Sequence, residues 1–143
     1  MKHKIGHLIS SSKYAGIEQH INELVSEFQN TDSKATIIAD KKIKNHFNNL
    51  NFINFANKYR FNPFNIIRLY KILKQNEIQL LHCHGNKSIF LGSILKNFLN
   101  IKLVATVHAF KSKQQSVKNY DVVIKVNKNI NLLHPKTCLL YTS

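Results

Sequence analysis

The stretch QLLHC at residues 79–83 decides the fold, because it is a short apolar run between two segments with helical periodicity. Consecutive apolar residues over this length are typical of a β-strand that is buried on both faces. Pro63 opens the helix predicted before it, over Phe64–Lys74, and a second helix is predicted after it, over Ser88–Phe98. A strand between two helices is the repeating unit of a parallel sheet.

The same alternation continues in both directions along the chain. Further strands and helices are predicted at Lys4–Ile9, Ala35–Ala39, Asn51–Phe55, Lys102–Val107 and Asp121–Val126 (strands), and from Ile17 and over Lys42–Phe47 (helices). In the helix over Ser88–Phe98 we expect Phe90, Ile94 and Phe98 to stack on one face. The sequence therefore predicts a single α/β domain with a doubly wound, Rossmann-like parallel sheet, whose central strands include Lys4–Ile9, residues 79–83 and Lys102–Val107.

The charge of the chain is unusually positive for a small domain. Lys and Arg number 21 against 7 Asp and Glu among 143 residues, which gives a formal net charge of +14. Such a charge is typical of proteins that bind nucleic acid, anionic membranes or phosphorylated substrates. AT-rich coding explains it equally well, because Lys, Asn, Ile and Phe are all abundant. Two cysteines do not build a disulfide framework, and we expect a cytoplasmic, reducing environment without a signal peptide.

The last six residues, CLLYTS at 138–143, match a translation of TGT CTC TTA TAC ACA TCT, the transposase recognition end used to tag DNA for sequencing. We interpret them as a sequencing-adapter scar that is not part of the fold. The domain is then expected to span residues 1–131, and residues 132–143 to form a truncated end. Under this interpretation, residues 138–143 should pack against nothing.

Ligands of doubly wound sheets bind beyond the carboxyl ends of the strands, and three of those ends are unusual here. Gly16 precedes the first helix, where free backbone N–H groups attract phosphate, and Glu18 lies in the first turn. The segment HCHG at 82–85 ends another strand, and His108 ends the strand over Lys102–Val107. Imidazoles at these positions are able to bind a sugar hydroxyl or a phosphate, although a tight turn and solvated histidines are the structural alternative.

A metal site is not expected in this segment. Strand alternation places His82 and His84 on one face and Cys83 on the other, and no further Cys or His follows at metal-ligand spacing.

Three other classes of α/β enzyme are excluded because their motifs are missing. The chain has no Gly-x-Gly-x-x-Gly after its first strand, no P-loop and no Gly-x-Ser-x-Gly elbow.

Four segments resemble the family 4 glycosyltransferases when they are taken in order. AGIEQH at 15–20 is similar to the family's Gly-Gly-x-Glu-x-His segment, and HCHG at 82–85 to its His-x-His-Gly segment. LVATVH at 103–108 is similar to Val-x-Thr-x-His, and DVVIKVN at 121–127 to Ala-Asp-x-Val-Ile-x-Val-Ser. Each segment alone is a weak signal, and their order with these intervening lengths is a much stronger one.

The resemblance implies a two-domain enzyme of the GT-B fold that transfers a sugar from a nucleotide sugar, with retention of configuration and without a metal or other cofactor. This chain would be the N-terminal, acceptor-side domain, and it would be inactive without the nucleotide-binding domain. The acceptor would be a glycan or a lipid-linked molecule, which fits a role in cell-envelope polysaccharide synthesis.

The resemblance also assigns roles to individual residues. It places Gly16, with Ala15 and Glu18, against the donor diphosphate, His108 as the catalytic residue against the transferred sugar, and His84 in the cleft. Two departures weaken the match: Ala15 replaces the first glycine, and the segment 111–120 is short enough to have lost a helix.

The predicted helix over Phe64–Lys74 carries Arg68, Lys71 and Lys74 on one side, while Ile66, Ile67, Tyr70 and Leu73 supply apolar surface. Basic amphipathic helices of this kind lie on anionic membranes, so the enzyme could be peripheral to the inner face of the membrane. A solvated basic surface is the alternative. The rival from another functional class is a basic module that binds nucleic acid or an anionic surface without catalysis. The charges are scattered over many elements, which disfavours this rival, and we expect no nucleic-acid partner.

Overall fold

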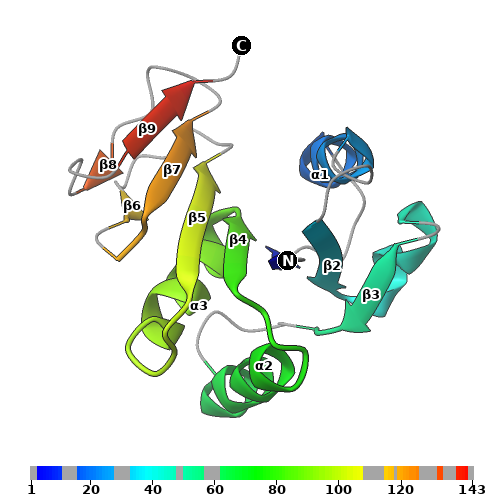
Figure 1. Ribbon diagram of the computed structural model, residues 1–143, viewed down its shortest axis with the longest axis horizontal. Helices are drawn as coiled ribbons and strands as arrows, with labels where there is room; N and C mark the ends of the chain where they lie inside the picture. The colour runs from blue at the N-terminus through cyan, green and yellow to red at the C-terminus, as the bar shows by residue number, and fades with distance from the viewer. Residues whose placement is uncertain are drawn as a thin grey trace.

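The computed structural model of the chain describes residues 3–10, 16–27, 33–47, 50–56, 62–107, 115–117, 119–125, 132–133 and 138–141. A seven-stranded parallel sheet in the order β3-β2-β1-β4-β5-β7-β9 forms its centre (Figure 1). The strands are β1 (His3–Ile9), β2 (Ser33–Ala39), β3 (Asn51–Asn54), β4 (Leu80–His84), β5 (Lys102–Val107), β7 (Val122–Lys125) and β9 (Cys138–Tyr141). The other elements are α1 (Gly16–Glu27), the 3-10 helix η2 (Lys41–His46), α2 (Pro63–Gln75), α3 (Asn86–Leu95), and the short paired strands β6 (Gln115–Ser116) and β8 (Leu132–Leu133).

The sheet is doubly wound, as the sequence predicted. From β1 the chain moves outward to β2 and β3, and then returns across β1 to build β4, β5 and β7 on the other side. The strand order therefore reverses between β1 and β4, and β1, β4 and β5 are the central strands, as expected. In sheets of this kind the point of reversal is where ligands bind.

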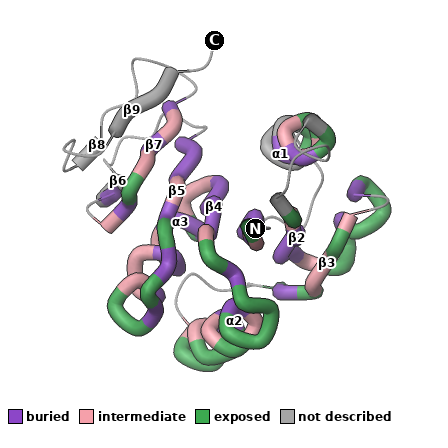
Figure 2. Tube along the Cα trace, viewed as in Figure 1, coloured by how far each residue is buried: buried purple, intermediate pink, exposed green. Residues whose placement is uncertain are grey.

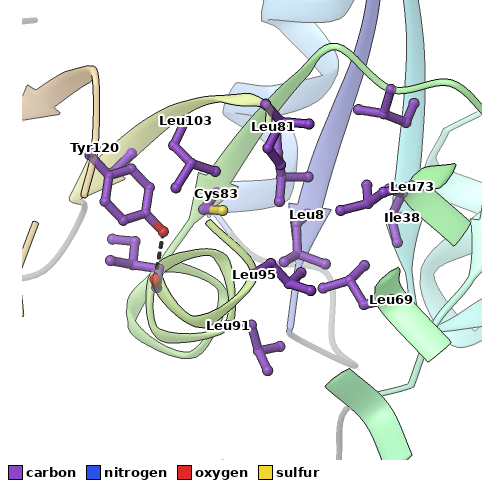
Figure 3. Close-up of a cluster of buried hydrophobic side chains, with 14 of the residues drawn as sticks. Leu8, Ile38, Leu69, Leu73, Leu81, Cys83, Leu91, Leu95, Leu103 and Tyr120 are labelled. Atoms are coloured by element: carbon purple, nitrogen blue, oxygen red, sulfur yellow. Dashed lines mark hydrogen bonds between the residues drawn. The ribbon is translucent and has the colours of Figure 1, made fainter. Parts of the chain in front are cut away.

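Helices cover both faces of the sheet, with α1 on one face and α2 and α3 on the other (Figure 1). Each face has its own apolar core. The smaller core, on the face of α1, contains Ile9, Ile21, Val25, Ile37, Ala39, Ile43 and Phe47. The larger one includes Leu8, Ile38, Leu69, Leu73, Leu81, Cys83, Leu91, Leu95, Leu103 and Tyr120 (Figure 3). Because side chains alternate along a strand, the residues on either side of Leu8 and Cys83 face the α1 side of the sheet.

The helix predicted over Ser88–Phe98 is α3, and the predicted place of Phe98 on it is wrong. The helix ends at Leu95, Phe90 and Ile94 are only half-buried, and Phe98 lies in the turn that follows with 66% of its surface exposed. The face toward the sheet is instead formed by Ser88, Leu91, Gly92 and Leu95, at spacings of three and four. The helix carries apolar residues on almost every side, so periodicity alone did not identify the buried face.

Gly92 allows α3 to approach β4 and the segment before β7. A Cβ atom at this position would lie 2.6 Å from the Tyr120 hydroxyl and 2.7 Å from the Cys83 sulfur. The Tyr120 hydroxyl donates a hydrogen bond to the carbonyl of Ile89, at 2.5 Å (Figure 3). Burial raises the pKa of Cys83 to about 12, so this cysteine stays a thiol and acts as a core residue.

We expect Gly92→Ala to lower the free energy of unfolding by about 2 kcal/mol, because an added methyl group has no room in this core. Urea unfolding followed by circular dichroism measures the loss. The cost should be smaller in a Tyr120→Phe background, where the nearest atom to the new methyl group is gone. Strictly additive effects of the two substitutions would show that the hydroxyl is not the obstacle.

The expectation that residues 138–143 pack against nothing is wrong for 138–141. These residues form β9, which pairs in parallel with β7 from Val122↔Cys138 to Lys125↔Tyr141. An apolar segment that favours β structure satisfies the backbone groups that β7 would otherwise leave unpaired at the sheet edge. Residues 142 and 143 lie outside the described residues, and the pairing does not test where the segment originates. Half of the segment 111–120, in which a helix was expected to be lost, lies outside them as well, namely residues 111–114 and 118. Its described residues include β6 (Gln115–Ser116), and none of them is helical.

Candidate functional site

The predicted site residues follow the carboxyl ends of the central strands. Gly16 is the first residue of α1, the helix that follows β1, and His84 is the last residue of β4. His108 comes directly after the last residue of β5. His108 and Ala15 themselves lie outside the described residues, as does the side chain of Glu18. The structure therefore shows that α1, which begins at Gly16, follows β1 and that His84 ends β4, the two strands between which the order reverses. The predicted roles of all five residues stay predictions.

Three buried histidines lie together across β1 and β4. His7 is the register partner of His82, and Ile9 is the partner of His84, so all three imidazoles project from the α1 side of the sheet. His82 and His84 stack with ring centroids 4.0 Å apart, and the His7 ring centroid lies 5.3 and 5.5 Å from theirs. The predicted separation of His82 and His84 from Cys83 is confirmed, because Cys83 lies in the core on the opposite face.

Polar contacts hold these rings in place. His7 Nδ1 and His84 Nε2 share a hydrogen bond of 3.2 Å, and His82 Nε2 lies 2.6 Å from the Thr106 hydroxyl of β5. No more than 6% of any of the three histidines is exposed. Burial lowers the pKa of His7 to about 4, because an imidazolium would lose its hydration there. His7 is therefore neutral at pH 7.

Sequence reasoning missed His7. It is the polar residue inside the apolar run of β1, and nothing local connects it to β4, which lies 75 residues further along the chain. We expected no metal site because the sequence has no third ligand at a suitable spacing from His82 and His84. The fold brings His7 beside them as a third potential ligand. One nitrogen from each histidine lies within 4.8 Å of the other two, which is close enough for all three to surround one ion. We call His7, His82 and His84 the histidine cluster.

The surroundings of the cluster suit an anionic ligand. The hydroxyl of Ser10, which follows β1, is 2.9 Å from the hydroxyl of Ser88 in the first turn of α3. Gly85 precedes α3 with φ of 84° and has open space where a Cβ would lie. The N-termini of α1 and α3 thus both follow strands at the point of reversal, and free N–H groups at such ends favour phosphates.

The sequence model of Glycosyltransferase Family 4 matches residues 14–128, which includes β4, β5 and the glycine that begins α1. The chain belongs to glycosyltransferase family 4. No curated protein matches the sequence. The predicted family, and with it the GT-B type of parallel sheet, is confirmed.

Solved glycosyltransferases share the fold of this family 4 domain at low sequence identity. MurG of Acinetobacter baumannii aligns with a TM-score of 0.70 and 12% identity over 98% of this chain and 45% of its own. A glycosyltransferase of Rickettsia africae ESF-5 gives 0.70 and 16%, over 96% and 42%. Anabaena Alr3699/HepE, solved with UDP and glucose, gives 0.68 and 16%, over 97% and 44%. The family 4 chain thus spans less than half the length of these structures, and its fold is that of a GT-B N-terminal domain.

The basic helix predicted over Phe64–Lys74 is α2. Asn62 caps it by accepting a hydrogen bond from the Phe64 backbone N–H at 3.0 Å, and Pro63 occupies the first turn. Lys71 and Lys74 are exposed, as is much of the outer side of the helix (Figure 2). Arg68 is exposed too, and its guanidinium carbon lies 5.3 Å from the ring centroid of Phe55.

Exposed apolar residues accompany the basic ones on α2. Phe64 is 76% exposed and Ile67 is 51% exposed, and at helical spacing they share a side with Arg68, Lys71 and Lys74. Of the residues expected to supply apolar surface, Ile67 is exposed, Ile66 and Tyr70 are half-buried, and Leu73 is buried in the core. Among the helices in the described part of the chain, none is long and apolar enough to span a membrane.

Proposed function

We propose that this domain forms the acceptor side of a retaining glycosyltransferase, which transfers a sugar from a nucleotide sugar to a glycan or a lipid-linked acceptor. The observation that carries the proposal is the family 4 match over a sheet in which β4 ends in His84, β5 ends directly before His108, and α1, which begins at Gly16, follows β1. The UDP and glucose in the Anabaena structure support a nucleoside diphosphate sugar as the donor.

The proposed roles are those that the family resemblance implies. The N-terminus of α1 at Gly16 lies against the donor diphosphate, where its N–H groups offset negative charge. His108 contacts the transferred sugar. His84 is buried beneath the edge with 2% of its surface exposed, so its contact with a substrate requires that the substrate reach below the surface of the described fold.

Ligand-dependent unfolding of the complete enzyme tests this function. UDP or a UDP sugar at 100 times its dissociation constant should stabilise the protein by about 2.7 kcal/mol, which raises its melting temperature. Active fractions should then release UDP from one donor of a panel when an acceptor extract is added, and the anomeric configuration of the product reports retention. An inverted product would remove the retaining assignment, and the absence of nucleotide binding by the folded enzyme would remove the function.

We further propose that the enzyme is peripheral to the inner face of the cytoplasmic membrane through the outer side of α2. Phe64 and Ile67 are positioned to enter the boundary between headgroups and acyl chains, while Lys71 and Lys74 attract anionic headgroups. The helix contains no acidic residue that would oppose this attraction. A lipid-linked acceptor at the same membrane would explain why such a surface is useful.

Replacing Lys71 and Lys74 together by Gln should weaken binding to anionic vesicles by about 2 kcal/mol, or roughly 30-fold, since each basic residue near the surface contributes about 1 kcal/mol. Arg68 is left intact because its contact with Phe55 gives it a role in the fold. Vesicle co-sedimentation measures the change. Lys34→Gln with Lys102→Gln is the matched control, because both lysines are exposed on the sheet and the net charge changes equally. Equal binding to neutral vesicles would rule out the electrostatic part of the proposal.

A further inference from the structure

We propose that the histidine cluster of His7, His82 and His84 binds one Zn²⁺ or a similar divalent transition metal between β1 and β4. It is the one group of three or more potential ligand side chains that the described part of the chain brings within reach of a single ion. The proposal concerns the chain itself, and it stands whether or not the enzyme transfers a sugar.

The strand geometry supplies the ligands. Two residues separated by one position project from the same face of a strand, and a register partner on the neighbouring strand lies beside them. His82 and His84 are such a pair on β4, and His7 is the partner of His82 on β1. The three ligands therefore come from two adjacent strands of the rigid centre of the sheet, which fixes their spacing before any ion is bound.

The distances fit a small divalent ion. Two imidazole nitrogens on a tetrahedral zinc lie about 3.3 Å apart, because each Zn–N bond is about 2.05 Å long. His7 Nδ1 and His84 Nε2 are 3.2 Å apart. The widest separation within the cluster is at most 4.8 Å, so ring rotation has to shorten it by no more than about 1.5 Å.

The chemistry of the ligands favours a transition metal over Mg²⁺ or Ca²⁺. Neutral imidazole nitrogens suit zinc, copper, nickel and iron, whereas the hard cations prefer oxygen. The proton that His7 and His84 share in their hydrogen bond would move to an outer ring nitrogen when the ion enters. The Thr106 hydroxyl is 2.6 Å from His82 Nε2. It would orient the His82 ring without contacting the ion itself.

Three protein ligands leave one tetrahedral position open for a water molecule or another oxygen ligand. Because His7, His82 and His84 are all buried within the fold, we assign the ion a structural role. It joins β1 to β4 where the strand order reverses, and so fixes the ends of the strands from which α1 and α3 start. Bound metal should consequently stabilise the fold.

The test uses chelator-treated protein, to which Zn²⁺ or Co²⁺ is added. Calorimetry should give one site per chain, Zn²⁺ should raise the melting temperature, and Co²⁺ should show the visible absorption of a tetrahedral complex. His7→Gln should weaken binding at least about 100-fold, since loss of a supporting group alone costs 10- to 100-fold. His3→Gln is the matched control, because His3 is an exposed histidine on the same strand and its loss should change nothing.

Circular dichroism of the metal-free variants separates a lost ligand from a lost fold. If His7→Gln does not fold, the wild-type protein still decides, because Zn²⁺ should shift the imidazole NMR signals of three buried histidines and leave the exposed ones unchanged. Failure of the folded wild-type protein to bind Zn²⁺ or Co²⁺ at millimolar concentration would overturn the proposal. Binding that His3→Gln weakens as much as His7→Gln would overturn it as well.

Discussion

Lowering the pH from 7 to 4 should cost the metal-free protein about 3 kcal/mol of its free energy of unfolding through His7 alone. The pKa of His7 falls from 6.5, the ordinary value of histidine, to about 4 in the folded chain, because burial removes the hydration of the imidazolium. Among the described residues, the imidazoles next to His7 are that of His84, which is hydrogen-bonded to it, and that of His82, whose ring is 5.3 Å away. Neither one is an anion that could stabilise a charged His7.

The direction of the effect follows from proton binding. Between pH 6.5 and pH 4 the unfolded chain binds a proton at His7 and the folded chain does not, so stability falls as the pH falls. Above pH 6.5 both states are neutral at this residue, and the full stability is present. Below pH 4 both states are protonated, and His7 causes no further loss.

Urea unfolding at a series of pH values measures this dependence. His7→Gln should flatten the curve between pH 6.5 and pH 4, because an amide does not titrate in this range. His3→Gln is the matched control, because it removes an exposed histidine from the same strand. An unchanged slope in a folded His7→Gln protein would show that other groups cause the acid sensitivity.

Replacing His108 by Ala in the complete enzyme should lower kcat by about 100-fold or more, equivalent to about 2.7 kcal/mol of transition-state stabilisation. His108 directly follows the last residue of β5, beside the strand end that bears His84. In the family it resembles, this histidine touches the donor sugar near the reacting carbon. Its role would be to position the sugar and stabilise developing charge, which is why a loss of turnover is expected.

Turnover and melting temperature should be measured on the same His108→Ala protein. We expect the melting temperature to change little, because a histidine at the edge of a cleft contributes little to core packing. His46→Ala, at an exposed histidine of η2, is the control and should keep full turnover. Normal kcat with a lowered melting temperature would remove His108 from the active site.

The candidate site shows where sequence reasoning succeeded. The apolar run at 79–83 predicted a buried central strand, and the two-residue period of a strand placed His82 and His84 together and away from Cys83. Both predictions use short-range geometry, which the order of residues fixes directly. The same local rules predicted α2, where Asn62 and Pro63 begin the helix.

The errors have different physical origins. Phe90, Ile94 and Phe98 were expected to stack on one face of a helix over Ser88–Phe98, but α3 ends at Leu95 and Phe98 lies beyond it. An almost wholly apolar helix also has no contrast between its sides. The packing of Gly92 against Tyr120 and Cys83 determines which side faces the sheet. Residues 138–141 were expected to pack against nothing. In the structure their backbone groups pair with those of β7, whose edge would otherwise be open.

By itself, the sequence determined the alternation of strands and helices, the parallel sheet and the family. It also determined which strands end in histidine or precede glycine. Each of these is set by neighbouring residues or by the order of short motifs. Only the tertiary structure decided that β1 lies beside β4 in the register that brings His7 to His82 and His84. That contact joins residues 75 positions apart, and it forms because burial of two apolar cores on opposite faces of the sheet fixes which strands are adjacent. The histidine cluster, and with it the depressed pKa of His7 and the proposed metal site, is therefore a product of the fold.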